Sequence, residues 1–133
     1  GTIGRKPTKA TFFEESNKFP SEIEAFVWLV EKMIAQNSSL FEKHDWQLEF
    51  VAKGSRTIYF SKDKNELFRD FKTPVQPSQY HKLKNGWYLK TALSRDQKYE
   101  ILCKLSAALR LSNAWSWHVI GEPEQSLDSL LGL

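Results

Sequence analysis

Apolar residues recur at helical spacing in two stretches of the chain. The first stretch, residues 21–36, carries a stripe made of Ile23, Phe26, Val27, Val30, Met33 and Ile34. The second begins after residue 94 and carries Ile101, Leu102, Leu105, Ala108 and Leu109. A stripe of this kind is typical of an amphipathic helix that buries one face. We therefore predict two main helices that share one core.

A capping box marks the start of each predicted helix. The pairs are Ser21 with Glu24, and Ser94 with Gln97. In such a box the Ser hydroxyl accepts a hydrogen bond from the amide of the third residue along, whose side chain accepts one from the Ser amide. The second helix is expected to end near residues 111–113.

A β-hairpin is predicted around Asn85-Gly86. Both residues tolerate the positive φ angles that a two-residue type I′ turn requires. Neither face of the hairpin is wholly apolar, so we expect either that it projects from the core or that one of its strands is short. The register that follows from this turn pairs Lys84 with Trp87, Lys82 with Leu89, and Tyr80 with Thr91.

Shorter elements are predicted from β-branched and aromatic runs and from turn residues. Residues 56–60 and 115–120 have the composition of strands. A short helix is expected from residue 61 to about residue 71. Residues 39–52 fit either a short helix at 39–43 followed by an extended piece at 46–52, which we favour, or a second helix.

These elements predict an α+β fold. We expect a single domain in which two main amphipathic helices pack on a small antiparallel sheet that contains the hairpin. A chain of 133 residues fits one domain. We place this domain at residues 20–120, between a flexible N-terminal segment (1–19) and an acidic C-terminal tail (121–133).

Positive charge is concentrated in the middle of the chain. Residues 53–110 carry 13 Lys or Arg and 5 Asp or Glu, a net charge of +8, whereas residues 1–52 carry −2 and residues 111–133 carry −3. A one-sided field of this kind favours a polyanionic partner. The alternative is a basic face that only contacts solvent.

The candidate interface combines basic residues with the aromatic residues Tyr80, Trp87 and Tyr88. We expect Arg56, Lys82, Lys84 and Lys90 to contact the phosphates of duplex DNA. Thr91, Ser94, Arg95 and Gln97, at the junction between hairpin and helix, are the candidates for approach to a groove. The alternative for Ser94 and Gln97 is that they only cap the helix.

Other chemistry finds little support in the sequence. There is no phosphate-binding glycine loop, and the three His and the one Cys lack the spacing of a metal site. We expect no catalytic residue, no cofactor and no metal, although the enzyme question stays open. A less favoured alternative is a nuclease or restriction-type component that uses Asp45, Glu49 and Lys53, or the triplet Asp70-Phe71-Lys72.

The cellular setting is inferred from cysteine usage and hydropathy. The single Cys103 cannot form an internal disulfide, and we expect it to be a packed, inert thiol. No apolar run reaches the length of a membrane span, and no signal-peptide pattern opens the chain. We therefore expect a cytoplasmic protein, nucleoid-associated in a bacterial cell, with no membrane partner. The sequence leaves homo-oligomerisation open.

Two short motifs carry a family resemblance. The run Gly54-Ser55-Arg56-Thr57-Ile58-Tyr59-Phe60 is followed by Asp63 and Leu67, and later by Trp87-Tyr88-Leu89 leading into a helix. In these residues the chain resembles the C-terminal DNA-binding domain of the SeqA replication-sequestration family, which binds hemimethylated GATC. The corresponding family runs are Gly-Arg-Thr-Arg-Val-Tyr-Phe and Tyr-Trp-Val-Ile, followed by an Asn/Thr-rich loop and a helix.

The resemblance covers roughly residues 24–112 and implies a DNA-facing junction between hairpin and helix. The family reads the methylated site with two Asn residues. Aligned on Trp87, those positions are Thr91 and Leu93 here. The resemblance therefore implies a non-enzymatic DNA-binding module without naming its target. A protein-interaction module, with Trp87, Trp115, Trp117 and the acidic tail as its contact patch, is the main alternative.

Overall fold

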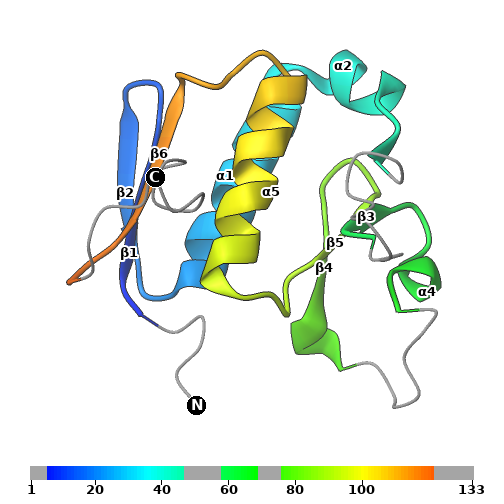
Figure 1. Cartoon of the computed structure of the whole chain (residues 1–133), viewed down its shortest axis with the longest axis horizontal. Helices are drawn as coiled ribbons and strands as arrows, with labels where there is room; N and C mark the ends of the chain where they lie inside the picture. Colours follow the sequence, from blue (N-terminus) through cyan, green and yellow to red (C-terminus); the bar gives the residue numbers. More distant parts are fainter. Residues whose placement is uncertain (1–5, 47–57, 69–75, 122–133) are drawn as a thin grey trace. The chain divides into compact units, whose positions relative to one another are not determined.

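The computed structural model describes residues 6–46, 58–68 and 76–121. The fold is α+β, with two main helices, α1 and α5, and antiparallel sheets that include hairpins (Figure 1). None of the helices within these ranges is both long and apolar enough to cross a bilayer. In chain order the elements are β1 (Thr8–Phe12), β2 (Glu15–Phe19), α1 (Glu22–Gln36), α2 (Ser38–Lys43), β3 (Phe60–Ser61), α4 (Lys64–Leu67), the 3-10 helix η1 (Pro77–Gln79), β4 (Tyr80–Lys82), β5 (Tyr88–Lys90), α5 (Arg95–Ala108) and β6 (Trp115–Val119).

The chain divides into two compact units. Unit 1 comprises residues 1–41 and 94–133, and unit 2 comprises residues 42–93. Unit 1 therefore contains both main helices and the sheet β2-β1-β6, whereas unit 2 contains the sheet β3-β5-β4. The division in the sequence falls inside α2 and directly before the N-cap residue of α5.

The sheet of unit 1 begins in the segment that we predicted to be flexible. Strand β1 pairs antiparallel with β2 on one side and with β6 on the other, so that Ala10 lies opposite both Asn17 and Trp117. Every second residue of β1 points inward, and these residues, Thr8, Ala10 and Phe12, are buried. The prediction of a flexible segment is therefore wrong for residues 8–19. The strand predicted at the end of the domain is confirmed as β6.

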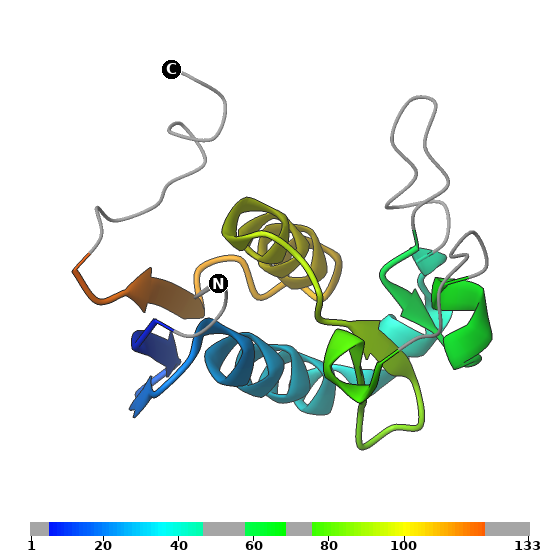
Figure 2. The same cartoon turned by 90° about the horizontal axis from the view of Figure 1, so that it is seen from below.

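Helices α1 and α5 begin where the two capping boxes were predicted, with Ser21 as the N-cap of α1 and a full box only at α5. The Ser21 hydroxyl accepts from the Glu24 amide at 3.2 Å, and the box of Ser94 and Gln97 is complete in both directions. Helix α1 packs against all three strands of its sheet and against α5. Helix α5 lies in front of α1 in Figure 1, and the two helices lie next to each other in Figure 2. The core that this packing encloses includes Ala25, Phe26, Leu29, Val30, Met33, Ile101, Leu102 and Leu105.

The hairpin of unit 2 has a different register from the predicted one. Lys82 lies opposite Tyr88 and Tyr80 lies opposite Lys90. The Leu83 amide donates to the Trp87 carbonyl at 2.7 Å, and the Gly86 amide donates to the Leu83 carbonyl at 3.0 Å. The loop thus holds three residues rather than two, and Gly86 adopts φ 93°, as in a type I turn followed by a left-handed residue.

In this register, which differs from the predicted one by one residue, side chains on both faces of the hairpin pack against other residues. Leu83 and Leu89 are buried, and Leu89 lies opposite the buried Phe60 of β3. Tyr80 and Tyr88 pack against a separate apolar cluster, which consists of Ile58, Leu67 and Phe68. The expectation of a projecting hairpin is therefore wrong, because a change of register by one residue exchanges the two faces of a strand.

The remaining sequence predictions are met in part. The short helix expected at 39–43 is present as α2. Within the described part of the chain, the strand expected at 56–60 contributes only Phe60 to β3, and the helix expected from residue 61 is α4. Most of the extended piece at 46–52, the end of the helix near residue 71 and the tail after residue 121 lie outside the described residues.

Candidate nucleic-acid interface

The candidate residues of unit 2 have different surroundings. Lys82 in β4 and Lys84 in the turn are exposed. Lys90 is only 8% exposed, with its ammonium 5.2 Å from the centre of the Phe68 ring. Thr91 is 2% exposed, and its hydroxyl donates to the Ser78 carbonyl at 3.0 Å. Both side chains are buried in this structure, and the contact roles of Lys90 and Thr91 stay a prediction. Arg56 lies outside the described residues.

The candidate residues of unit 1 stabilise the start of α5. The Ser94 hydroxyl accepts from the Gln97 amide at 3.1 Å, and the Gln97 side chain accepts from the Ser94 amide at 2.9 Å. Arg95 forms an ion pair with Glu22 of α1. The capping role of Ser94 and Gln97 is confirmed, whereas a role in DNA reading stays a prediction. The predicted junction at 91–97 includes the division between the two units.

Unit 2 places lysine side chains over aromatic rings. The Lys64 ammonium lies 5.6 Å from the centre of the Tyr80 ring, and the Lys82 ammonium lies 6.0 Å from that of Tyr88. The two Tyr rings are themselves 5.9 Å apart. These four side chains form a continuous surface, which we call the lysine–tyrosine face. The attraction between a cation and an aromatic ring is worth about 0.5–1 kcal/mol at an exposed site. It holds each lysine near its ring while the ammonium stays in contact with solvent.

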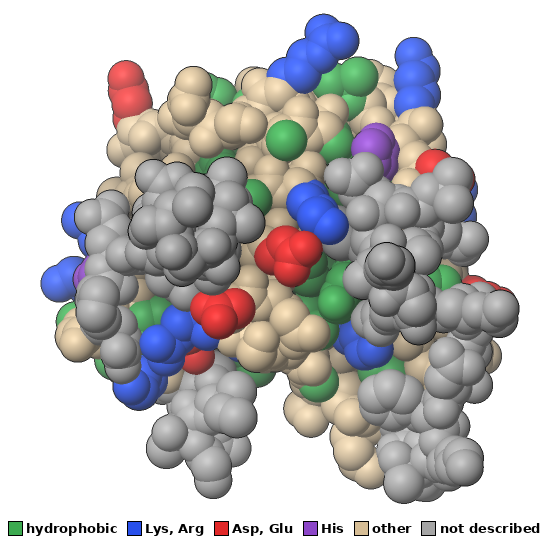
Figure 3. Space-filling model, in the orientation of Figure 1, with side chains coloured by type: hydrophobic (Ala, Val, Ile, Leu, Met, Phe, Trp, Pro, Cys, Tyr) green, Lys and Arg blue, Asp and Glu red, His purple; other side chains and the backbone are tan. Residues whose placement is uncertain are grey.

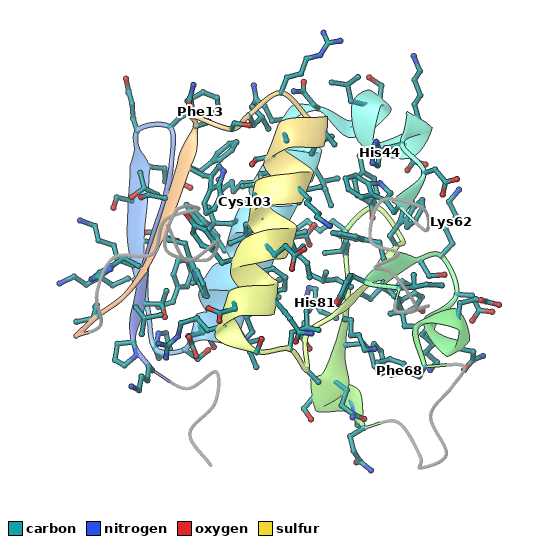
Figure 4. All side chains as sticks on the ribbon, viewed as in Figure 1. Phe13, His44, Lys62, Phe68, His81 and Cys103 are labelled. Atoms are coloured by element: carbon teal, nitrogen blue, oxygen red, sulfur yellow. The ribbon has the colours of Figure 1, made fainter. Side chains whose placement is uncertain are left out.

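A second group of rings surrounds a hollow of about 270 Å³ in the same unit. We call it the Trp87 pocket. The Trp87 indole donates to the Glu42 carboxylate at 3.3 Å, and the Lys62 ammonium lies 5.5 Å from the centre of the Trp87 ring. His44 and Lys62, both labelled in Figure 4, also line this hollow. The pocket thus combines ring faces with an exposed cation.

The formal charge differs between the two units. Unit 2 carries ten Lys or Arg and six Asp or Glu, a net charge of +4, whereas unit 1 carries nine and ten, a net charge of −1. On the face drawn in Figure 3, the described basic side chains are interspersed with acidic ones. The excess of formal positive charge therefore lies in unit 2.

Two exposed lysines of unit 2 were not among the contact residues predicted from the sequence. Lys62 and Lys64 are both exposed and flank Asp63, whose carboxylate accepts from the Asn65 amide at 2.9 Å and caps α4. The alternation Ser61-Lys62-Asp63-Lys64, directly after a predicted strand, was the available signal. Their positions over Tyr80 and Trp87 depend on tertiary packing, so no local pattern indicates them.

Lys98 belongs to the interior of unit 1. Its side chain is 0% exposed, and its ammonium has no hydrogen-bond partner among the described residues. Burial lowers the pKa of Lys98, the nearby Glu22 opposes this effect, and Arg95 adds to it. The signal was its spacing, because Lys98 lies one helical turn before Ile101 and Leu102 on the buried stripe.

The structure also describes residues of the alternative functions, the protein-interaction module and the nuclease. Trp117 is only 3% exposed, so it cannot belong to an exposed patch with Trp87 and Trp115. Burial raises the pKa of the Cys103 thiol, with a smaller opposing effect of a hydrogen bond with Tyr99 and a further rise from Glu100. Within the described ranges, no three His, Cys, Asp or Glu side chains are grouped as a metal site requires. Of the nuclease candidates, Asp45 alone is described.

Comparison of the chain with protein-family models, with curated proteins and with solved structures finds no match.

Proposed function

We propose that the chain is a non-enzymatic DNA-binding module whose contacts with duplex DNA are made by unit 2. The observation that carries this proposal is a group of exposed lysines in a unit of net charge +4, which includes Lys62, Lys64, Lys82 and Lys84. Exposed ammonium groups neutralise phosphates and release condensed counterions, which is the main source of affinity that does not depend on sequence. The resemblance to the SeqA family supports the same partner, with the target site left undefined.

The geometry of the lysine–tyrosine face supports contact with the DNA backbone rather than reading of bases. A lysine is a flexible point charge with three donors, and it suits phosphate better than the fixed pattern of a base edge. Lys82 and Lys84 lie on the β4 side of the hairpin and at its tip. We therefore expect high affinity at low salt and little discrimination between duplex sequences from these two residues.

The test is a pair of charge-matched double variants. Lys82→Gln with Lys84→Gln removes two charges from unit 2. Lys9→Gln with Lys18→Gln removes two exposed charges from unit 1, where the two residues lie opposite each other on β1 and β2. Fluorescence anisotropy with a short labelled duplex should show an affinity loss on the order of tenfold for the first pair and little change for the second.

Two results would contradict the proposal. If the wild-type chain does not bind duplex DNA at low salt, the module has another function. If the two double variants lose affinity equally, binding follows total charge, and the assignment of the contacts to unit 2 is wrong.

A further inference from the structure

The Trp87 pocket has the size and lining of a site for one flat ring. Its volume of about 270 Å³ is slightly below the range of about 300–1,000 Å³ that is usual for ligand pockets. Trp46 lines the pocket. Its ring packs on that of Phe60, with ring centres 5.1 Å apart, and the His44 ring lies 4.2 Å from that of Trp46. A pocket of this size has room for a single aromatic heterocycle rather than for a stack of two.

The polar groups around the rings differ from those of a simple phosphate site. Lys62 supplies a cation, but Asp45 and Asp63 supply carboxylates, and Ser61 supplies a hydroxyl. Carboxylates repel a phosphate and accept hydrogen bonds from amino groups, as they do from the exocyclic amine of cytosine. The lining therefore suits a base with an amino group, whose own phosphate would lie outside the hollow near the exposed Lys62.

Trp87 is held in a fixed orientation before any ligand binds. Its indole N–H donates to Glu42, and the same carboxylate lies 3.8 Å from the Lys62 ammonium. The Lys62 side chain is 71% exposed, so it can leave the ring face for a phosphate at little cost. A fixed ring beside a mobile cation is the combination that single-stranded segments use, since bases stack on rings while cations follow the backbone.

From these contacts we infer that the Trp87 pocket takes one unpaired, amino-bearing base of a bound DNA strand, with cytosine as the best fit. The inference rests on the proposed function, because unit 2 must already hold the strand through its lysines. It adds a preference to that function: the module favours duplexes that contain an unpaired base over continuous duplexes. Lys62 contacts the phosphate next to that base, and Trp87 stacks on the base itself.

The experiment compares three duplexes of one sequence context. One is fully paired, one carries a single bulged cytosine, and one carries a single bulged thymine, which has no exocyclic amine. We expect the bulged cytosine to bind about tenfold more tightly than the paired duplex, within the range that stacking of one base on one ring gives. The bulged thymine should lie between the two.

Variants assign this preference to the pocket. Trp87→Ala should reduce the ratio of the affinities for the bulged-cytosine and the paired duplex to about one, and Trp87→Phe should keep most of this ratio. The matched control is Trp28→Ala in unit 1, because Trp28 also has a lysine over its ring, Lys32 at 5.5 Å. Trp28→Ala should keep the full preference, and circular dichroism of each variant separates loss of stacking from loss of fold.

The outcomes separate this inference from the proposed function. If no duplex binds, both fail. If the paired duplex binds with the expected dependence on Lys82 and Lys84, but the bulged duplexes bind no better, only the pocket assignment fails. Equal loss in Trp87→Ala and Trp28→Ala also overturns it, as does an affinity for free cytidine monophosphate equal to that for the bulged duplex.

Discussion

A pair of buried charged residues in unit 1 contrasts with three exposed lysines in unit 2. In unit 1, Glu22 and Lys98 are buried between two helices, and Glu22 pairs with Arg95. In unit 2, Lys62, Lys64 and Lys82 stay exposed over aromatic rings. A buried charge has a large effect on the free energy of unfolding, in either direction. An exposed charge has a small effect on it and is accessible to a partner. This difference is the reason why we propose unit 2, rather than unit 1, as the unit that binds DNA.

The largest expected effect is on the stability of unit 1. Glu22→Gln removes the carboxylate that pairs with Arg95 and that lies near the buried Lys98. Removal of one partner of a buried pair costs about 3–5 kcal/mol, and we expect about 2–4 kcal/mol here because Arg95 is 29% exposed. Urea denaturation followed by circular dichroism measures this loss. Unchanged stability, or a loss of duplex affinity in the folded variant, would break the comparison.

Lys98→Met changes the same buried region of unit 1, but we expect it to raise the stability of the protein rather than lower it. The variant fills a similar volume without an ammonium that lacks a hydrogen-bond partner among the described residues. We expect it to raise the free energy of unfolding by about 1–3 kcal/mol at neutral pH, the usual cost of an unsatisfied buried polar group. The gain should be larger in the Glu22→Gln background, because Glu22 offsets part of the penalty on Lys98.

The pH dependence of Lys98 has a defined sign. Its pKa is lowered in the folded chain, whereas the unfolded chain binds this proton up to a pH of about 10.4. Between these two pKa values the unfolded state holds more protons, so the stability of the wild-type chain rises with pH through that interval. Lys98→Met should lack this rise, and its stability advantage should shrink as the pH approaches 10.4. An advantage that does not depend on pH would contradict the assignment.

The smallest expected effect concerns Ser94, for which we predicted either a helix-capping role or a role in DNA reading. Ser94→Ala removes the hydroxyl that accepts from the Gln97 amide and should cost about 1 kcal/mol of stability. Because Ser94 belongs to unit 1, we expect its duplex affinity to equal that of the wild-type chain. An affinity loss of tenfold with little change in stability would instead assign Ser94 to the DNA interface.

Local signals explain which parts of the fold were predictable. The starts of α1 and α5 follow from capping residues and apolar stripes, which lie within a few residues of each other. The β1–β2 hairpin was missed because two of its three buried positions are Thr8 and Ala10, which are only weakly apolar. Its two-residue turn also places Phe13 at φ 55°, where Gly is the usual residue.

The candidate site was predictable only where a residue's exposure followed from its place in a turn. The Asn85-Gly86 pair located the hairpin and the exposed Lys84, but the same pair fits two loop lengths, and the register was missed by one residue. That single step decided that Lys90 faces Phe68.

The dependence of duplex affinity on salt tests the central claim most directly. Each phosphate contact contributes about −0.9 to the slope of log affinity against log salt concentration. We predict that Lys82→Gln with Lys84→Gln makes this slope less negative by about 1.8 relative to the wild-type chain, and that Lys9→Gln with Lys18→Gln leaves it unchanged. Equal slopes in all three proteins would contradict the claim that unit 2 holds the DNA backbone.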